Sequence, residues 1–401
     1  MIEPPGLVER LVAGALAGQH DDALFGAFCE ELVTAGLPLL RGALGAEFLH
    51  PAYDVRQLRW VRGTGAYDHT SPREPDGVPE STDWLTSPPY HLAQQNLRTL
   101  RRRIDPASIA EFPILAEIGA IGGTEYLVFR QPVGPDAVFG DGEEVFTSWV
   151  TDRPEGFHDA EFALLERLQP QLVLAVAAVA NVSIGRMLLE TYLGRDAARR
   201  VLAGNIVRGR TDTIRAVIWY SDLQGFTRLS DTLPRAEILA LLNEYVEPVV
   251  EAVVAEGGEV LKFMGDGILA IFGGRPPAEA CAAALRARAR VDAATAVVNE
   301  RRLGRNAAVT KPYIALQEGE VFYGNFGGPT RLDFTVLGPA VNEAARIAAL
   351  CRSLDQTVVV SEAFAAGCGV DGNRLVGLGR YALRGVGRPQ MLWTLDSTVP
   401  S

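Results

Sequence analysis

The sequence predicts an α+β protein in three parts, and three observations support this prediction. The chain has 401 residues, which are enough for two or three domains. Its C-terminal part alternates strand-like and helix-like segments in the order β-α-β-β-α-β, which is typical of a ferredoxin-like sandwich. A long stretch with helical periodicity precedes that part, and mixed strands and helices come before it. We therefore expect an α/β domain over 1–157, a helical connector over 158–210 and an α+β sandwich over 211–397.

The composition is that of an acidic globular protein. Hydrophobic residues make up 48% of the chain and charged residues 22%. The formal net charge of −11 argues against a nucleic-acid partner, which would require a basic face. The four cysteines lack the spacing of a zinc site or a disulfide framework, which favours a reducing, cytoplasmic location. Glu3, Pro4 and Pro5 stand where a signal peptide would carry basic residues.

The N-terminal part predicts helices and strands without a motif that names a chemistry. Apolar residues at helical spacing predict helices over Leu7–Leu16 and Asp22–Ala35. The strand-like segments are Val55–Val61, Glu125–Arg130 and Glu144–Val150. The stretch Asp68–Pro89, rich in Pro, Ser, Asp and Gly, predicts a loop. A basic cluster, namely Arg98, Arg101, Arg102 and Arg103, is either a solvated face or an anion site.

The connector is expected to be helical from Asp159 to about Leu202, with Pro170 as a kink or break. The stretch Leu168–Gly185 carries no charge, but it contains several polar residues. Its continuous apolar core, Leu172–Ala180, is too short for a bilayer, which needs about 20 residues. We therefore expect no membrane span, and a buried helix at a dimer seam; an inert spacer is the alternative.

The C-terminal part follows the same patterns. Helices are expected over Glu237–Ala255, Ala278–Arg302 and Ala340–Cys351. The expected strands are Ala216–Tyr220, Val260–Met264, Ile268–Phe272, Tyr313–Gln317, Val321–Phe326, Phe334–Leu337, Thr357–Val360, Arg380–Leu383 and Met391–Leu395.

Two short motifs place a carboxylate on a turn beside a strand. Asp222 follows an apolar strand, and Gly225 lets the chain turn back over it. Asp266 stands between Gly265 and Gly267 at the tip of a predicted hairpin. Either motif alone is equally consistent with ordinary turn chemistry. Together, two such carboxylates are suited to hold divalent cations over a polyphosphate.

A third motif lies downstream, where Asn342 and Arg346 stand one turn apart on a helical face. The segments Tyr220–Thr227, Lys262–Gly267 and Phe334–Arg346, in this order, resemble the class III nucleotide cyclases, which make cyclic AMP or cyclic GMP from a nucleoside triphosphate. The resemblance covers roughly Thr213 to Leu395 and implies the ferredoxin-like cyclase fold. Strands followed by a long helix in the N-terminal part resemble, more loosely, a GAF sensor domain; a structural dimerisation domain is the alternative.

The resemblance implies metal and phosphate ligands. Asp222 and Asp266, with the Leu223 carbonyl, are expected to bind two Mg²⁺ or Mn²⁺ ions in each active site. The backbone N–H groups of the turn, Gly225, Phe226 and Thr227, are expected to receive phosphate oxygens. Arg384 matches a basic ligand of the terminal phosphate.

The resemblance also implies catalytic and substrate-reading residues. Asn342 is expected to orient the ribose, and Arg346 to stabilise charge on the α-phosphate as the ribose 3′ oxygen attacks it. Lys262 and Thr335 are expected to read adenine, which makes ATP the substrate. Glu320 and Thr335 depart from the arginine and aspartate that some members carry, and the first departure puts one phosphate contact in doubt.

The implied assembly is a homodimer with shared active sites, because the chain has one cyclase segment and the family builds each site from two. An unknown small-molecule or protein signal is expected to act on the N-terminal domain. Two alternatives stay open, namely a guanylate cyclase and a non-catalytic nucleotide-binding regulator on the same fold.

Overall fold

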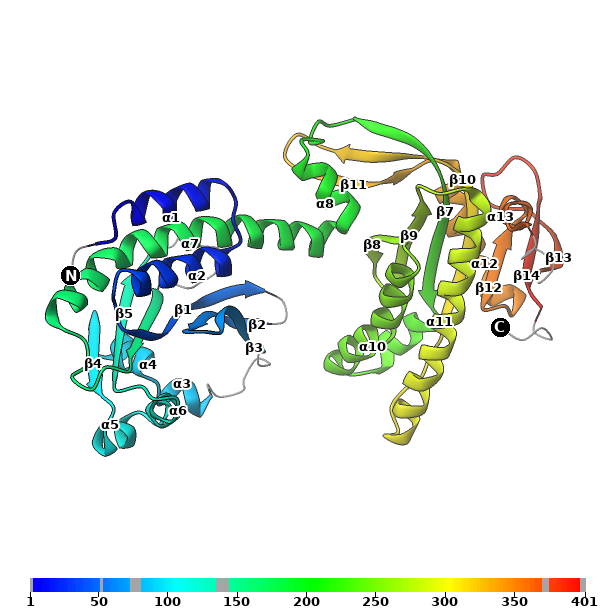
Figure 1. Cartoon of the computed structure of the whole chain (residues 1–401). Coiled ribbons are helices and arrows are strands. Elements are labelled where there is room, and N and C mark those ends of the chain that lie inside the picture. The colour runs from blue at the N-terminus through cyan, green and yellow to red at the C-terminus, as the bar shows by residue number, and fades with distance from the viewer. Residues whose placement is uncertain (1–2, 51–52, 73–80, 135–143, 370–374, 397–401) are drawn as a thin grey trace. The chain divides into compact units, whose positions relative to one another are not determined.

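The computed structural model describes residues 3–50, 53–72, 81–134, 144–369 and 375–396. The chain divides into two compact units between Leu188 and Leu189 (Figure 1). This division falls inside the predicted connector, and the boundaries of 157 and 210 stay predictions.

The N-terminal unit is built on a six-stranded sheet in the order β3-β2-β1-β6-β5-β4. All neighbouring strands in it are antiparallel. The strands are β1 (Leu39–His50), β2 (Tyr53–Val61), β3 (Gly65–Pro72), β4 (Thr99–Arg103), β5 (Glu125–Pro132) and β6 (Glu144–Thr151). The predicted loop over Asp68–Pro89 is wrong where β3 runs to Pro72 and where the helices α3 (Thr82–Leu85) and α4 (Pro88–Gln94) begin, and residues 73–80 lie outside the described residues.

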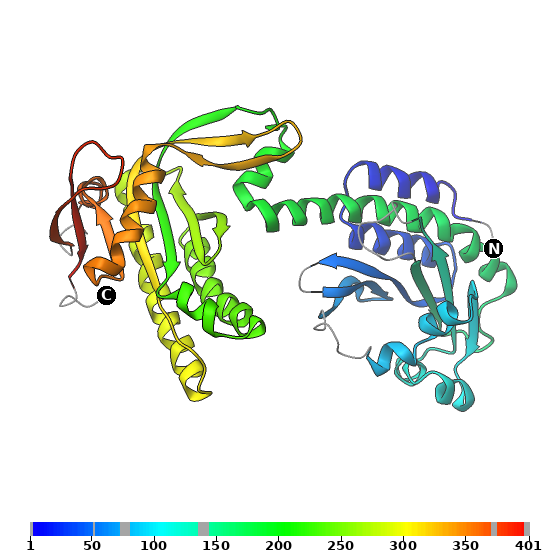
Figure 2. The same ribbon diagram turned by 180° about the vertical axis from the view of Figure 1, so that it is seen from behind.

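Helices cover both faces of this sheet. Figures 1 and 2 show α1 (Leu7–Leu16), α2 (Asp21–Thr34) and α7 (Asp159–Leu193) together on one face, where they enclose a core around Trp60 and Trp149. A second core joins β4, β5 and β6 to three short helices, α4 (Pro88–Gln94), α5 (Pro106–Glu111) and α6 (Ile114–Ala120). The short α3 (Thr82–Leu85) precedes them.

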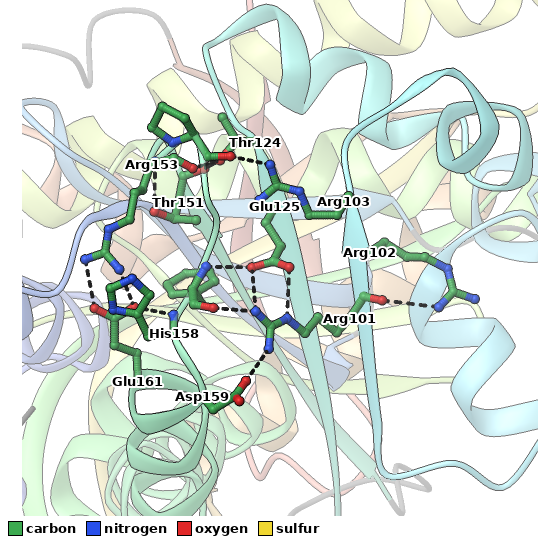
Figure 3. A network of polar contacts seen from close by, with 12 residues as sticks. Arg101, Arg102, Arg103, Thr124, Glu125, Thr151, Arg153, His158, Asp159 and Glu161 are labelled. Atoms are coloured by element: carbon green, nitrogen blue, oxygen red, sulfur yellow. Dashed lines mark hydrogen bonds and ion pairs between the residues drawn. The ribbon is translucent and has the colours of Figure 1, made fainter.

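A polar network holds the start of α7 against the sheet (Figure 3). The buried Glu125 accepts from Arg101 Nε at 2.8 Å and from the Phe157 N–H at 2.6 Å. The buried Glu161 accepts two bonds of 2.9 Å from Arg153 and reaches back to the His158 N–H at 2.8 Å, as a carboxylate does at the third position of a helix.

The basic cluster takes part in these internal contacts. Arg101 also pairs with Asp159 at 3.2 Å, and Arg102 pairs with Glu111 at 2.9 Å. Arg103 donates to the Pro154 carbonyl. Since these three guanidinium groups already have partners within the unit, the contacts favour a structural role over an anion site for the cluster.

One helix among the described residues, α7, is long and apolar enough to cross a membrane by length and composition. It continues through Pro170 without a break and ends before Gly194. Its residues Leu164, Leu168, Leu172 and Val176 are buried in the core of the N-terminal unit, so this part of the helix is held inside the protein.

The C-terminal unit is built on an eight-stranded sheet in the order β13-β14-β12-β10-β7-β9-β8, with β11 paired to β10. The strands are β7 (Thr211–Leu223), β8 (Glu259–Met264), β9 (Gly267–Gly273), β10 (Pro312–Gly327), β11 (Leu332–Leu337), β12 (Val358–Ser361), β13 (Leu375–Tyr381) and β14 (Gln390–Leu395). β10 and β7 pair along 13 residue positions, from Pro312 opposite Leu223 to Gly324 opposite Thr211. This long antiparallel pair is the centre of the unit.

Helices also cover both faces of this sheet. On one face α10 (Arg235–Ala255), α11 (Pro277–Gly304) and α13 (Glu362–Gly367) pack over Trp219 and Phe272. On the other face α12 (Pro339–Leu354) packs on β7, β10 and β12, and α8 (Arg195–Leu202) packs beside β11. The short α9 (Phe226–Thr232) follows β7. The predicted α+β class is confirmed.

Candidate functional site

Asp222 stands near the end of β7, at the centre of the sheet. The apolar residues before it, Val217, Ile218 and Trp219, are fully buried, so the strand is fixed up to this point. Gly225 then takes a left-handed conformation with φ of 71° and starts α9. Phe226 and Leu229 pack against Leu241 and Tyr245 of α10, which holds the turn in place.

Asp266 stands at the tip of the β8–β9 hairpin. Met264 pairs with Gly267, so Gly265 and Asp266 form a two-residue turn. Gly265 has φ of 65°, which favours glycine, and a Cβ on Gly267 would lie only 3.1 Å from the Met264 carbonyl oxygen and 3.3 Å from that of Ser221. β9 pairs with β7, which brings the hairpin tip beside the end of β7.

The structure therefore brings the two carboxylates together, as the motifs predict. Asp266 Oδ2 accepts a 3.0 Å hydrogen bond from the Leu223 N–H. Burial, and next the charge of Asp266, raises the pKa of Asp222 to about 6. Burial and the same two carboxylates raise the pKa of the neighbouring Tyr220. Burial, followed by the charge of Asp222, raises the pKa of Cys351 on α12 to about 12.

The carboxylate pair fits a divalent cation. Asp222 Oδ1 is buried and has no hydrogen-bond partner in the described part of the chain. A buried, unpartnered carboxylate oxygen beside a second carboxylate is costly unless a cation balances the charge. All three expected ligands, the carboxylates of Asp222 and Asp266 and the Leu223 carbonyl, offer oxygen, which Mg²⁺ and Mn²⁺ prefer.

Lys262 and Thr335 lie on β8 and β11. Lys262 Nζ forms an ion pair with Asp333, which stands two residues before Thr335. Thr335 is buried opposite Gly324 of β10. The sequence motifs did not indicate Asp333. Strand alternation, which puts positions 333 and 335 on one face of β11, could have indicated it as a neighbour of Thr335.

Asn342 and Arg346 lie on α12, as predicted. Asn342 is exposed and Arg346 is half-buried. The Arg346 guanidinium lies against Gly385, since a Cβ on that glycine would be 3.3 Å from Nη2. The structure thus brings Arg346 to the loop that carries Arg384, which is exposed.

The candidate residues therefore form two groups in one chain. One contains Asp222, Asp266 and the turn of Gly225, Phe226 and Thr227. The other contains Asn342, Arg346 and Arg384. Among the described residues no hydrogen bond or ion pair joins the two groups. Arg352 of α12, which the motifs did not single out, acts on Asp222 through its charge.

Comparison with known proteins gives relatives for part of the chain. No family model matches it. An adenylate cyclase of Anabaena cylindrica is 30% identical over 162 residues, which are 39% of this chain and 32% of that protein. An uncharacterized protein of Mycobacterium tuberculosis is 34% identical over 173 residues, which are 42% of this chain and 30% of that protein. In both cases the match spans less than a third of the relative's length.

Solved structures of cyclases also match. The adenylyl cyclase CyaB from P. aeruginosa has a TM-score of 0.43 and 23% identity, covering 48% of this chain and 97% of that chain. The guanylyl cyclase Cya2 has a TM-score of 0.41 and 27% identity, covering 46% of this chain and 93% of that chain. The GAF-like character of residues 1–157 stays a prediction. The resemblance of the C-terminal part of this chain to the nucleotide cyclases, predicted from its three motifs, is confirmed by the adenylate cyclase relative.

Proposed function

We propose that this chain is an adenylate cyclase, which converts ATP to 3′,5′-cyclic AMP and pyrophosphate. The observation that carries the proposal is the buried carboxylate pair, with Asp222 Oδ1 unpartnered and Asp266 anchored to the Leu223 N–H. Cyclase relatives and the Asn342/Arg346 pair on α12 support it.

Asp222, Asp266 and the Leu223 carbonyl are the residues that would hold two Mg²⁺ or Mn²⁺ ions. When bound, these ions lower the pKa of the ribose 3′ hydroxyl and neutralise charge on the leaving pyrophosphate. The turn after β7 offers the N–H groups of Gly225, Phe226 and Thr227 to phosphate oxygens, since the first N–H groups of a helix have no intrahelical acceptor.

Arg346 is proposed to stabilise the transition state. Its guanidinium is half-buried and has no ion-pair partner among the described residues, so its donors are available to an α-phosphate. Asn342, one turn earlier, would orient the ribose, and Arg384 would meet the terminal phosphate.

The substrate preference rests on Lys262 and Thr335. A lysine can only donate, which suits the N1 acceptor of adenine, and the threonine hydroxyl can accept from the N6 amino group. Guanine presents an N1 donor and an O6 acceptor, and it would leave these groups unpaired at a cost of about 1–3 kcal/mol each.

We further propose a homodimer in which each site takes its metal-binding carboxylates from one subunit. The other subunit would supply Lys262 and Thr335, which read adenine, and also Asn342 and Arg346. The absence of a hydrogen bond or ion pair between the carboxylate pair and Asn342 or Arg346 in the described part of the chain is consistent with this arrangement. The N-terminal unit is proposed to be a cytoplasmic sensor that acts through the connector.

Incubation of the purified chain with ATP or GTP and Mg²⁺ or Mn²⁺, followed by identification of the cyclic product, tests the activity. We expect cyclic AMP from ATP, and none from Asp222→Ala or Asp266→Ala. Faster turnover of GTP than of ATP at equal concentration would replace the adenylate assignment by a guanylate one. No cyclic product from either nucleotide would favour a non-catalytic regulator.

A further inference from the structure

In the N-terminal unit, cationic side chains lie close together on one face of the strands β1, β2 and β3. Helices α4, α5 and α6 pack on β4, β5 and β6, and the same face continues over β1, β2 and β3. There Arg59 of β2 stands opposite Ala43 of β1 and Tyr67 of β3. Arg41 lies two positions from Ala43 along β1, and His69 lies two positions from Tyr67 along β3. Alternation along the strands therefore puts Arg41, Arg59 and His69 on one face as diagonal neighbours.

These cations lack an anionic partner of their own. Arg59 donates to Gln57 Oε1 at 3.0 Å from Nε and 2.8 Å from Nη2, but an amide oxygen carries no charge. In the described part of the chain no carboxylate forms an ion pair with Arg41 or Arg59. Glu117 of α6 acts on Arg59 only through its charge, and the Tyr67 side chain is a further hydrogen-bond partner of Arg59. Both arginines are half-buried, so water screens their repulsion less than at a free surface.

The electrostatics agree with this geometry. Burial, and next the charge of Arg41, lowers the pKa of Arg59. Burial, followed by Arg59 and Arg41, lowers the pKa of His69. Arg101 and Arg153, near the start of α7, bind the carboxylates of Glu125 and Glu161. Arg41, Arg59 and His69 instead repel one another when they are charged.

The surroundings are suited to a small polar ligand. Along β1 the residues on this face become smaller from Arg41 to Ala43 to Gly45, and the Gln57 side chain, which accepts from Arg59, lies over Gly45. Ser148 of β6 stands opposite Ala43, and its side chain is hydrogen-bonded to Tyr126 of β5. Phe146, opposite Gly45, packs edge-on against Trp84 of α3 at 6.3 Å between ring centroids.

We infer that Arg41 and Arg59, with His69 beside them, form a binding site for the phosphate or carboxylate group of a small molecule. Two guanidinium groups bind such an oxyanion through charge-assisted hydrogen bonds, and the anion removes their mutual repulsion. This site lies on the sheet of the N-terminal unit and is independent of the proposed cyclase chemistry.

The test measures thermal unfolding of the full chain in inorganic phosphate, in malonate and in chloride at equal ionic strength. We expect phosphate or malonate to raise the midpoint by about 2–4 °C over chloride. The anion that gives the larger rise identifies the ligand group. Hydrogen exchange should show the added protection on β1 and β2.

Substitutions distinguish the site from general salt effects. Arg41→Gln and Arg59→Gln should each lose most of the anion-induced rise, and Arg41→Gln should keep or gain stability in chloride. Arg186→Gln, an exposed arginine on α7, removes the same charge and should leave the rise intact. Asp222→Asn should also leave it intact, which separates this site from the catalytic one. Equal rises in wild type and both arginine variants, no rise in any protein, or protection elsewhere would overturn the inference.

Discussion

Asp222 lies where a carboxylate is unfavourable without a cation. Its Oδ1 is buried and unpartnered, and Asp266 stands beside it. The first prediction is that Asp222→Asn raises the unfolding midpoint of the metal-free chain by about 2–4 °C, because the amide carries no charge to repel Asp266. The same variant should form no cyclic AMP.

The effect of Mn²⁺ on the unfolding midpoint is a second test of Asp222 as a metal ligand. Mn²⁺ should raise the midpoint of the wild type, since a ligand that binds only the folded state stabilises it. It should leave Asp222→Asn unchanged. Asp212→Asn, an exposed aspartate at the other end of β7, is the matched control and should respond to Mn²⁺ as the wild type does. An equal response to Mn²⁺ in Asp222→Asn and the wild type would remove Asp222 from the metal ligands.

The ion pair of Lys262 with Asp333 changes how substrate preference is tested. Glutamate at position 262 suits guanine, because a carboxylate accepts from the N1 and N2 donors. Beside Asp333, however, it would meet a second carboxylate. The second prediction is therefore that Lys262→Glu with Asp333→Asn and Thr335→Cys moves preference from ATP towards GTP by about tenfold or more, the effect of one repaired polar contact.

Initial rates with each nucleotide measure this ratio. Asp333→Asn alone is the control and should retain ATP preference. A triple variant that is active but keeps the wild-type ratio would show that these positions do not read the base. The motif alone could not supply Asp333, because its pairing with Lys262 joins strands that are distant in sequence.

At the scale of elements, sequence patterns predicted the long helices well and some strands poorly. β1 was missed although it is central, because Gly42 and Gly45 interrupt its apolar pattern and weaken strand propensity. β10 was predicted as two strands, because Glu318-Gly319-Glu320 resembles a turn; in the structure β7 pairs with it throughout. Glu318 is buried and bound to Arg215, a long-range contact that local patterns do not reveal.

The start of α7 gives the third prediction. Glu161 is buried and binds Arg153 through two bonds, so Glu161→Ala leaves a partly buried guanidinium unpaired. Breaking such a pair costs about 3–5 kcal/mol when both groups are buried, and Arg153 is 22% exposed, which brings the cost to the lower limit or below it. We expect a loss of about 2–3 kcal/mol, and faster hydrogen exchange in the first turns of α7.

The matched control is an exposed ion pair between α7 and the N-terminal segment of the chain. Arg167 pairs with Glu3 at 2.9 Å, with 60% and 35% of the two side chains exposed. Glu3→Ala should therefore cost no more than about 1 kcal/mol. If both substitutions had equal effects, the network in Figure 3 would not anchor the connector.

At the scale of the whole molecule, the proposed order of sensor, connector and catalytic unit leads to the hypothesis that the N-terminal unit sets the reaction rate. The division between Leu188 and Leu189 lies inside α7, so one helix belongs to both units. Helical periodicity predicted the connector, and the resemblances to a GAF domain and to the cyclases predicted the two parts on either side of it. It could not predict how the candidate site is completed, because one chain holds both groups of residues and a shared site depends on a second copy.

The last prediction tests whether each active site takes residues from two subunits. Asp222→Ala lacks a metal ligand and Arg346→Ala lacks the transition-state arginine, so each homodimer should be inactive. In a heterodimer one site combines both defects. The other takes its carboxylates from the Arg346→Ala chain and its arginine from the Asp222→Ala chain, so it is intact. Equal co-expression should give half heterodimers with one intact site of two, hence about a quarter of wild-type cyclic AMP formation.

The control for this experiment mixes two defects of the same group. Asp222→Ala and Asp266→Ala both damage the carboxylate pair, so their heterodimer has no intact site and should stay inactive. Differently tagged subunits, purified through both tags, confirm that heterodimers are measured. Activity restored in the first mixture and not in the second is expected only if the two groups in one chain serve different sites. A purified Asp222→Ala/Arg346→Ala heterodimer without activity would place the complete site within a single chain.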